Sequence, residues 1–431
     1  MSVALLIRGG TVVDTTGTRR ADVAVDDGVV VEVGPDLQAK AGASILDAGG
    51  CVVAPGLVDL HVHLREPGHE QAECVETGAR AAALGGYTAV LAMPNTDPAI
   101  DSAAVVRQVL ALGRGATAEV AVAGAITLGR KGERLAPMAE MAALGVRMFT
   151  DDGKGVDDAR LMRRAFEYAS ALGVTLAQHC EEASLAAGGQ MNEGEWSARL
   201  GIPGIPAEAE ELMVARDLAL ARLTGARLHL LHLSTAGSVA LVRAAKAVGQ
   251  TAVTAEAAPH HLSLTDDEVA GYDPVFKVNP PLRCASDVAA VQAGLADGTL
   301  DAIATDHAPH PQESKEAPFE SAPPGMIGLE TALAVAITHL SPTLGLAEIL
   351  ALCSWRPAAI AGLGARHGGP VAAGRPANLC VIDPAARWSV DPAKSASRSR
   401  NTPFAGRALT GRVIHTVYRG EPVVLGSEAL R

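Results

Sequence analysis

The chain has 431 residues, of which 48% are apolar, and a formal net charge of −12 at pH 7. The apolar fraction excludes an intrinsically disordered chain, and the acidic balance argues against a nucleic acid or an anionic membrane as a partner. Six dispersed cysteines are typical of reduced thiols, and the lack of an apolar stretch of roughly 18 residues or of a targeting pattern at the N-terminus predicts a cytoplasmic protein.

Both ends of the chain are predicted to form short strands. These segments are rich in β-branched residues and are interrupted by Gly-Gly, Asp-Asp-Gly, Asp-Pro or Arg-Gly turns. Neither end is long enough for a β-domain of its own, so we expect residues 1–54 and 366–431 to form the two parts of one small β-domain. The predicted strands are residues 5–13, 22–25, 29–33, 378–382 and 412–424.

The middle of the chain, residues 55–365, alternates between short apolar runs and Ala-, Leu- and Arg-rich stretches of helical character. Eight such runs separated by helical stretches predict the α/β class, in the form of a (β/α)8 TIM barrel. One long polar, proline-rich loop, residues 309–324, follows the eighth run. The eight predicted strands are residues 56–61, 87–93, 119–124, 146–149, 174–179, 227–232, 251–255 and 301–305.

The first of these strands ends in His61-Val-His63, and this pair indicates a metal site. Side chains at positions i and i+2 of a strand lie on the same face, so both imidazoles point to one place at the strand end, where barrel active sites lie. Alone, the pattern fits ordinary strand histidines equally well. Further polar residues lie at the ends of other predicted strands, and their number favours metal binding over a packing role. These residues are Asp151, Asp152, His179, His232 and Asp306.

Imidazole and carboxylate ligands without cysteine are typical of catalytic zinc. The set is large enough for two zinc ions, which need a bridging anion, and either Asp151 or Asp152 can supply it. Zinc lowers the pKa of its bound water and so makes a hydroxide nucleophile near neutral pH. Asp306 is the remaining carboxylate, suited to take the proton of that water and return it to a leaving nitrogen.

Three further polar residues near the same mouth are candidates for substrate binding. Arg65 is suited to clamp a substrate carboxylate, although a salt bridge with Glu66 or Glu70 is the alternative. Asn95 and Asn279 could donate hydrogen bonds to a substrate, but asparagine is also common in loops. A small-molecule substrate carrying a carboxylate is therefore expected.

A series of motifs, spread in order over nearly the whole predicted barrel, carries a family resemblance. The first is Pro-Gly-Leu-Val-Asp-Leu-His-Val-His-Leu-Arg-Glu-Pro-Gly at residues 55–68. The others lie at residues 93–96, 149–153, 179–181, 201–206, 232–238, 254–261, 277–283, 304–310 and 328–331. On these motifs the chain resembles the dihydroorotases of the amidohydrolase superfamily. The resemblance implies reversible cyclisation of N-carbamoyl-L-aspartate to L-dihydroorotate and water, a step of pyrimidine synthesis.

One detail favours a subgroup of this family. Many relatives bridge their two metals with a carboxylated lysine at the end of strand four, whereas here no lysine lies between Lys131 and Lys154 and the motif Phe-Thr-Asp-Asp-Gly takes that place. This is similar to bacterial dihydroorotases that bridge with aspartate, and it argues against hydantoinases and allantoinases. By resemblance, Asp152 occupies the bridging position, and one or two zinc ions are bound per chain, with two favoured.

The resemblance also assigns the other site residues. It implies that His61 and His63 bind one zinc ion, that His179 and His232 bind the second, and that Asp306 is both a ligand and the proton carrier. The implied substrate contacts are His63, Arg65, Asn95, Asn279, His310 and the backbone of Pro324 and Gly325.

The chain departs from the family pattern in one place. Where relatives often have Pro-Phe-Gly, it has Pro-Pro-Gly at residues 323–325, and Pro324 has no backbone N–H to donate. Two rival functions are another cyclic amidase, such as a hydantoinase or allantoinase, and an inactive barrel that serves as a scaffold for aspartate transcarbamoylase. The sequence leaves open a homodimer and a complex with aspartate transcarbamoylase.

Overall fold

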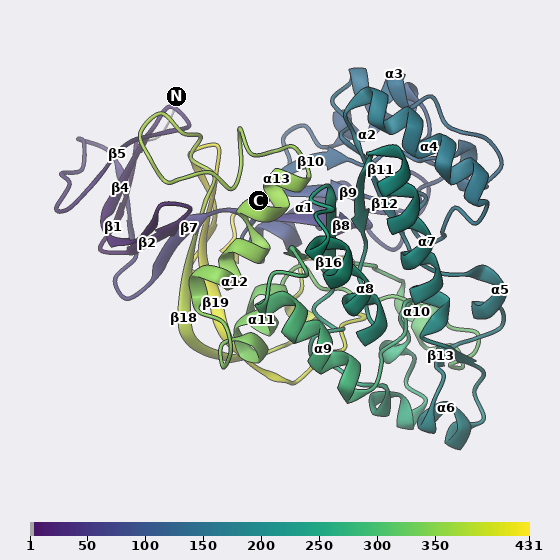
Figure 1. Cartoon of the computed structure of the whole chain (residues 1–431). Coiled ribbons are helices and arrows are strands. Elements are labelled where there is room, and N and C mark those ends of the chain that lie inside the picture. The colour runs from purple at the N-terminus through teal and green to yellow at the C-terminus, as the bar shows by residue number, and fades with distance from the viewer. Residues whose placement is uncertain (1–3) are drawn as a thin grey trace.

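The computed structural model describes residues 4–431, and parallel strands surrounded by helices form its centre (Figure 1). Two parallel sheets have the strand orders β10-β9-β8 and β11-β12-β15-β16-β17. Bridges from Gly124 to Phe149 and from Val62 to His307 link the two sheets at both of their edges. The strands are β8 (Leu57–Val62), β9 (Tyr87–Ala92), β10 (Glu119–Val122), β11 (Met148–Phe149), β12 (Thr175–Gln178), β15 (Arg227–Leu230), β16 (Val253–Ala257) and β17 (Ala302–Ile303). The α/β class is confirmed, and each of the eight predicted runs overlaps one of these strands, although β8 and β16 extend one and two residues beyond the predicted ends.

Helices follow most of these strands and pack against them through apolar faces. Helix α4 (Ala159–Leu172) shows why they form: the Asp158 side chain accepts a hydrogen bond from the Leu161 N–H at its start, and Gly173 ends it with φ +67°. The other helices of eight residues or more are α1 (Val75–Leu84), α2 (Ala103–Leu112), α7 (Glu208–Thr224), α8 (Ala236–Ala247), α9 (Ala285–Ala296), α11 (Ala332–Leu340) and α12 (Leu346–Cys353). Shorter ones are α3 (Met138–Ala143), α5 (Ala183–Ala186), α6 (Glu195–Leu200), α10 (Gln312–Lys315) and α13 (Trp355–Ile360).

Strands from the two ends of the chain pair with each other. One sheet has the order β5-β4-β1-β6, and a second, with the order β21-β20-β19-β18-β7-β2-β3, joins N-terminal and C-terminal strands, which lie side by side in Figure 1. Gly9, with φ +77°, divides the predicted strand 5–13 into two strands that belong to different sheets. The bounds are β1 (Leu5–Arg8), β2 (Thr11–Asp14), β3 (Gly17–Arg20), β4 (Asp22–Asp26), β5 (Val29–Gly34), β6 (Ser44–Asp47), β7 (Val52–Pro55), β18 (Leu379–Ser389), β19 (Ala408–Tyr418), β20 (Glu421–Leu425) and β21 (Glu428–Ala429); β13 (Met191–Asn192) and β14 (Gly204–Ile205) form a separate pair.

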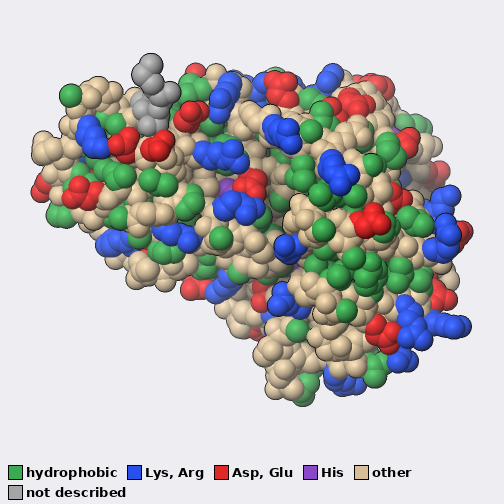
Figure 2. Space-filling view, turned by 90° about the horizontal axis from the view of Figure 1, so that it is seen from above, with side chains coloured by type: hydrophobic (Ala, Val, Ile, Leu, Met, Phe, Trp, Pro, Cys, Tyr) green, Lys and Arg blue, Asp and Glu red, His purple; other side chains and the backbone are tan. Residues whose placement is uncertain are grey.

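On the face shown in Figure 2, basic and acidic side chains are interspersed with each other and with apolar ones. Among the helices of residues 4–431, none is at once long enough and apolar enough to cross a bilayer.

A partly exposed carboxylate with two basic partners stabilises the end of the parallel strands that lies away from their carboxyl termini. Glu119, the first residue of β10, accepts hydrogen bonds from His367 Nε2 at 2.9 Å and from Arg366 Nη2 at 2.5 Å. Burial raises the pKa of Glu119, but the hydrogen bonds from His367 and Arg366 outweigh burial and lower this pKa to about 2, from an ordinary value of 4.5.

We therefore expect Glu119→Gln to destabilise the fold in a pH-dependent way. A depressed carboxyl pKa stabilises the folded state fully above about pH 4.5, and this contribution is lost as the pH falls towards 2. Urea unfolding of both proteins should show that the free energy of unfolding of E119Q is about 1–3 kcal/mol lower than that of the wild type at pH 7. This difference should become smaller below pH 4.5. A deficit that stays constant down to pH 3 would show that the carboxylate charge is not its source.

Candidate metal centre

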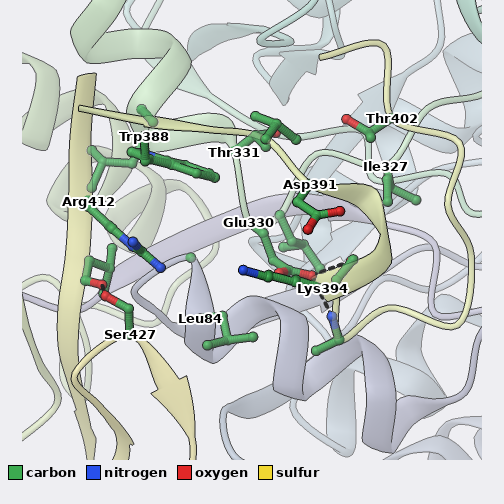
Figure 3. Close-up of a pocket in the computed structure, with 18 of the residues that line it drawn as sticks. Leu84, Ile327, Glu330, Thr331, Trp388, Asp391, Lys394, Thr402, Arg412 and Ser427 are labelled. Carbon is green, nitrogen blue, oxygen red and sulfur yellow. Dashed lines mark hydrogen bonds between the residues drawn. The ribbon is translucent and has the colours of Figure 1, made fainter. Parts of the chain in front are cut away.

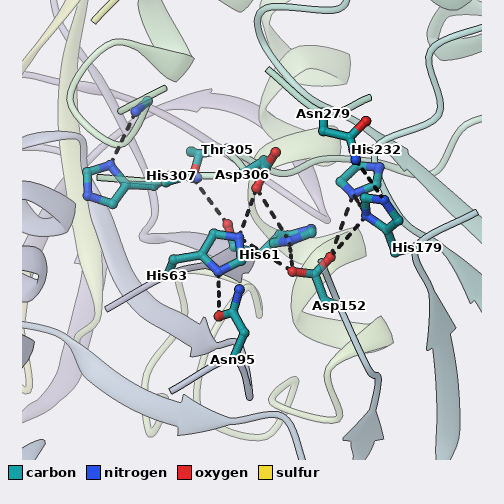
Figure 4. Close-up of polar contacts among 12 residues, drawn as sticks. His61, His63, Asn95, Asp152, His179, His232, Asn279, Thr305, Asp306 and His307 are labelled. Atoms are coloured by element: carbon teal, nitrogen blue, oxygen red, sulfur yellow. Dashed lines mark hydrogen bonds and ion pairs between the residues drawn. The ribbon is translucent and has the colours of Figure 1, made fainter. Parts of the chain in front are cut away.

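Strand β8 delivers two imidazoles to the carboxyl end of the parallel sheets, as the i, i+2 spacing predicts. His61 Nε2 lies 3.2 Å from Asp152 Oδ2 and 3.5 Å from Asp306 Oδ1. His63 Nε2 lies 3.1 Å from Asp306 Oδ1 and 3.5 Å from Asp152 Oδ2. Figure 4 shows both rings directed at the two carboxylates. Residues some 240 positions apart in the chain therefore converge on one point.

Two further imidazoles approach Asp152 from the opposite side. His179 follows β12 and His232 follows β15. His179 Nδ1 lies 3.5 Å from Asp152 Oδ1, and His232 Nε2 lies 3.7 Å from the same oxygen. The two facing ring nitrogens are 3.0 Å apart. Asp152 thus stands between two pairs of imidazoles, which is the position expected of a bridging ligand.

The donor set fits a transition metal. All six side chains are buried, and none belongs to a residue that is more than 5% exposed. Two groups, His61 with His63 and Asp306, and His61 with Asp152 and His232, each have ligand atoms within 4.8 Å of one another. His61 Nε2 and Asp152 Oδ1 are buried without a hydrogen-bond partner, a condition that costs free energy unless another group satisfies them. Imidazoles and carboxylates are the typical ligands of catalytic zinc.

The charges of the site favour ionised carboxylates. Burial raises the pKa of Asp152, but His61, His179 and His232 around it hold that pKa well below its usual range. Burial likewise opposes ionisation of Asp306, and the neighbouring His61 and His63 lower the pKa of that carboxyl instead. Both aspartates therefore stay anionic at neutral pH, as metal ligands must be.

Other side chains contact two of the clustered imidazoles from the side away from Asp152. The His63 Nδ1–H donates to Asn95 Oδ1 at 2.8 Å, which leaves Nε2 directed at the carboxylates. The Asn279 amide nitrogen lies 3.4 Å from His179 Nε2. Asn95 and Asn279, predicted as substrate contacts, thus both touch the imidazole cluster, and the Oδ1 of Asn279 is buried without a partner.

Three residues of the site have left-handed backbone conformations. The φ angles are +63° for Arg65, +31° for His232 and +47° for Asp306. Such a conformation costs a non-glycine residue about 1–3 kcal/mol and is found chiefly at functional sites. Because each of these residues follows one of the parallel strands, the bend there directs the side chain towards the imidazole cluster instead of continuing the alternation of the strand.

The structure distinguishes Asp151 from Asp152, whereas the sequence alone left both as candidates for the bridging ligand. Asp151 points away from the imidazoles, and its Oδ1 accepts hydrogen bonds from the backbone N–H groups of Ile126 at 2.8 Å and Thr127 at 3.0 Å. Its Oδ2 accepts from the Thr127 hydroxyl. Asp152 alone of the pair faces the imidazole cluster, so Asp151 holds a neighbouring loop.

Arg65 lies at the same mouth and has no acidic partner within residues 4–431. Its Nε donates to the Pro309 carbonyl at 3.1 Å, and its Nη2 lies 3.4 Å from His310 Nε2. The two acids that offered an alternative role are occupied elsewhere, because Glu66 accepts from the Val75 N–H and Glu70 from the Gly68 N–H. The guanidinium therefore lies beside the cluster without a direct ion pair, and Asp306 and Asp152 act on its charge only at longer range.

The loop that contains Pro324 and Gly325 differs in detail from the expectation. The Gly325 N–H, predicted to face the substrate, donates to the Lys277 carbonyl at 2.9 Å. Pro324 contributes its carbonyl, which accepts from His310 Nε2 at 2.8 Å. Gly325 has φ +144°, and a Cβ there would lie 2.7 Å from His310 Nε2, so only glycine fits. In this structure the loop positions His310 and offers no free backbone N–H at residue 325.

Sequence reasoning missed two charged residues near the cluster. Glu256 lies within β16, and its carboxylate accepts a hydrogen bond from the His61 Nδ1–H at 3.1 Å. Arg130 makes no ion pair among the described residues, and its buried Nε has no partner. A carboxylate inside an otherwise apolar strand was the available signal for Glu256. Nothing in the sequence around Arg130 distinguishes it from a surface residue.

A cavity of about 700 Å³ lies apart from the cluster (Figure 3). Residues of α11, β18 and β19 line it, together with the loop that carries Asp391 and Lys394. It reaches His307, the residue after Asp306, but none of the six clustered side chains lines it. The cavity is therefore not the metal centre.

Parallel strands with imidazoles and carboxylates gathered at their carboxyl ends define an amidohydrolase-type enzyme, and the comparisons agree. The structure is similar to that of the L-hydantoinase (dihydropyrimidinase) from Arthrobacter aurescens, with a TM-score of 0.89 and 26% identity, covering 100% of this chain and 98% of that one. A sequence profile described as dihydro-orotase-like matches residues 50–238.

Full-length relatives are closer in sequence. The dihydroorotase of Streptomyces coelicolor is 52% identical over 425 residues, covering 97% of this chain and 98% of that protein. The dihydroorotase of Pelotomaculum thermopropionicum is 50% identical over 424 residues, with the same coverage. The chain belongs to the dihydroorotase family.

Proposed function

We propose that this protein is a zinc-dependent dihydroorotase, which interconverts N-carbamoyl-L-aspartate with L-dihydroorotate and water. The observation that carries the proposal is the convergence of four imidazoles on Asp152 and Asp306, beside an arginine without an acidic partner. The imidazoles and carboxylates suit an amide hydrolysis, and the free guanidinium suits a substrate with a carboxylate. Relatives at about 50% identity over nearly the full length bear that name.

Two zinc ions are proposed, with Asp152 between them. His61 and His63 would hold one ion and His179 and His232 the other, with Asp306 as a further ligand. When bound, the metal supplies Lewis-acid polarisation of the amide carbonyl and an activated water. The geometry supports this assignment because Asp152 places one oxygen towards each pair of imidazoles.

The remaining chemistry belongs to the chain's own residues. Asp306, held by His63 at 3.1 Å, is an anionic carboxylate within the cluster and is proposed to take a proton from the attacking water and deliver it to the departing ring nitrogen. The Arg65 guanidinium, with Asn95, Asn279 and His310, is proposed to grip the substrate carboxylate and orient the ring. Asp306 is buried, which strengthens its electrostatic contacts, whereas the four residues proposed to hold the substrate are partly exposed.

We also propose the complete architecture that such a site requires. The linked parallel sheets are taken to close into a (β/α)8 barrel over residues 55–365, supported by the bridges at Gly124 and Val62. Residues 1–54 and 366–431 are taken as the two parts of one small β-domain, supported by the sheet that contains strands from both ends.

Two rival functions are weaker. A hydantoinase or allantoinase would give no reason for Arg65 to lie unpaired at the mouth, and the structural neighbour named L-hydantoinase shares only 26% identity, half that of the Streptomyces dihydroorotase. An inactive scaffold would not need six clustered ligand side chains. A substrate panel decides: we expect hydrolysis of L-dihydroorotate and not of uncharged dihydropyrimidines or hydantoins, and the reverse selectivity would overturn the proposal.

Arg65→Gln should alter that selectivity. Loss of a charge-assisted contact to the substrate carboxylate is expected to reduce kcat/KM for dihydroorotate about 10–100-fold, mainly through KM. The matched control is Arg80→Gln, which removes a partly exposed arginine paired with Glu76 and should leave kinetics unchanged. Equal kcat/KM for dihydroorotate in R65Q and wild type would exclude Arg65 as the carboxylate clamp.

A further inference from the structure

Glu256 is a fully buried carboxylate that two histidines share. Its Oε1 accepts from the His61 Nδ1–H at 3.1 Å, and its Oε2 accepts from His229 Nε2–H at 2.9 Å. Glu256, His61 and His229 each have 0% exposure. His229 Nδ1 lies 2.8 Å from the Thr254 hydroxyl, so a chain of four side chains runs outward from the metal centre across β15 and β16.

We infer that Glu256 is a positioning residue for the metal ligand His61, and that His229 and Thr254 hold Glu256 in the required rotamer. This inference rests on the proposed function, because it assumes that the cluster binds metal. A carboxylate can only accept from the His61 Nδ1–H, so the lone pair of that ring must lie on Nε2, the nitrogen that faces Asp152 and Asp306.

The two histidines at the end of β8, His61 within the strand and His63 just after it, are held by partners of different charge. The neutral amide of Asn95 orients His63, whereas a full negative charge orients His61. His61 belongs to both groups of converging ligand atoms, while His63 belongs to one. The anionic partner therefore supports the imidazole that is common to both groups. It also makes that imidazole more basic and a stronger ligand.

His229 is needed to fix the orientation of the Glu256 carboxylate, which it shares with His61. Each carboxylate oxygen of Glu256 has one imidazole donor, and the second donor prevents the group from turning away from His61. A buried carboxylate with one donor would leave an oxygen unsatisfied, at a cost in free energy. His229 is not directed at the cluster, so its contribution to metal binding must pass through Glu256.

The test is the zinc affinity of the full chain, measured by competition with a chromophoric chelator in the absence of substrate, together with the visible absorption of the Co²⁺-substituted protein. Glu256→Gln keeps the shape of the side chain but can accept from only one of the two imidazoles. We expect its zinc affinity to fall about 10–100-fold and the Co²⁺ absorption bands to shift. His229→Gln should weaken zinc binding in the same direction by a smaller factor.

The chain contains a matched control. At the opposite ends of the strands, Thr88, His367 and Glu119 repeat the same Thr–His–Glu arrangement, with distances of 3.0 Å and 2.9 Å, away from the metal centre. Glu119→Gln therefore removes a histidine-bound carboxylate in the same arrangement, here partly exposed, and should keep wild-type zinc affinity and Co²⁺ absorption, although its stability falls.

The zinc affinities and Co²⁺ spectra of these variants either support or overturn the role inferred for Glu256. Unchanged zinc affinity and Co²⁺ absorption in E256Q would overturn the inference, as would an equal loss of affinity in E119Q. If E256Q does not fold, His229→Gln decides, and wild-type affinity in that variant would overturn it. Wild-type protein that binds zinc but does not hydrolyse dihydroorotate would overturn the proposed function alone, while a wild-type protein that binds no zinc would overturn both.

Discussion

Replacing Asp306 by asparagine is expected to reduce the hydrolysis of dihydroorotate about 100- to 10,000-fold, the usual contribution of a positioned acid–base group, while zinc remains bound. Asparagine keeps an oxygen that can ligate but cannot take up a proton at neutral pH. The wild-type carboxylate is anionic because the neighbouring His61 and His63 lower the pKa of Asp306, so it is ready to accept that proton. Steady-state kinetics with metal analysis of the same preparations measures both effects.

The control for this variant lies at the other end of the same segment. Asp301 directly precedes β17 and pairs with Lys246 at 2.7 Å, away from the mouth. Asp301→Asn should therefore retain both turnover and zinc. If D306N loads zinc and turns over as fast as wild type, Asp306 is not the proton carrier.

Asp152→Asn is expected to have the largest effect on metal binding. The Asp152 carboxylate lies within 3.2–3.7 Å of all four clustered imidazoles, so its charge holds both halves of the site together. Zinc affinity should fall by more than the roughly 10–100-fold that loss of an outer partner costs, and activity should fall with it. Metal content after dialysis against a weak chelator gives the measurement.

The neighbouring residue supplies the control. Asp151→Asn changes the same side chain one position earlier, where it accepts hydrogen bonds from Ile126 and Thr127. We expect wild-type zinc content and a loss of about 1–3 kcal/mol of stability. Zinc loss in D151N with retention in D152N would reverse the assignment of the two aspartates.

The local pattern of the chain predicted much of this site because strand geometry is local. The i, i+2 spacing of His61 and His63 requires one face of β8, and both Nε2 atoms do approach the same two carboxylates. The eight apolar runs predicted the parallel strands because a strand buried on both faces needs an uninterrupted apolar segment. Neither prediction depends on which elements are neighbours in the tertiary structure.

Beyond the strand ends, the alternation of side chains no longer predicts which way a side chain points. Asp151 and Asp152 both follow β11, and only the loop conformation turns one of them to the imidazoles. Arg65 had two acids close by in the sequence, yet hydrogen bonds from backbone N–H groups occupy both of them. The Gly325 N–H has a carbonyl acceptor from a segment nearly 50 residues away. Each of these choices depends on a partner that the sequence does not identify.

By itself, then, the amino-acid sequence determined the α/β class, the strands and the kinds of ligand, because side-chain periodicity and donor chemistry are properties of short segments. Only the tertiary structure decided which aspartate faces the imidazoles, that Arg65 is unpaired, and that Glu256 is shared by His61 and His229. These are contacts between segments up to about 240 residues apart, and their directions depend on how strands pack and loops bend.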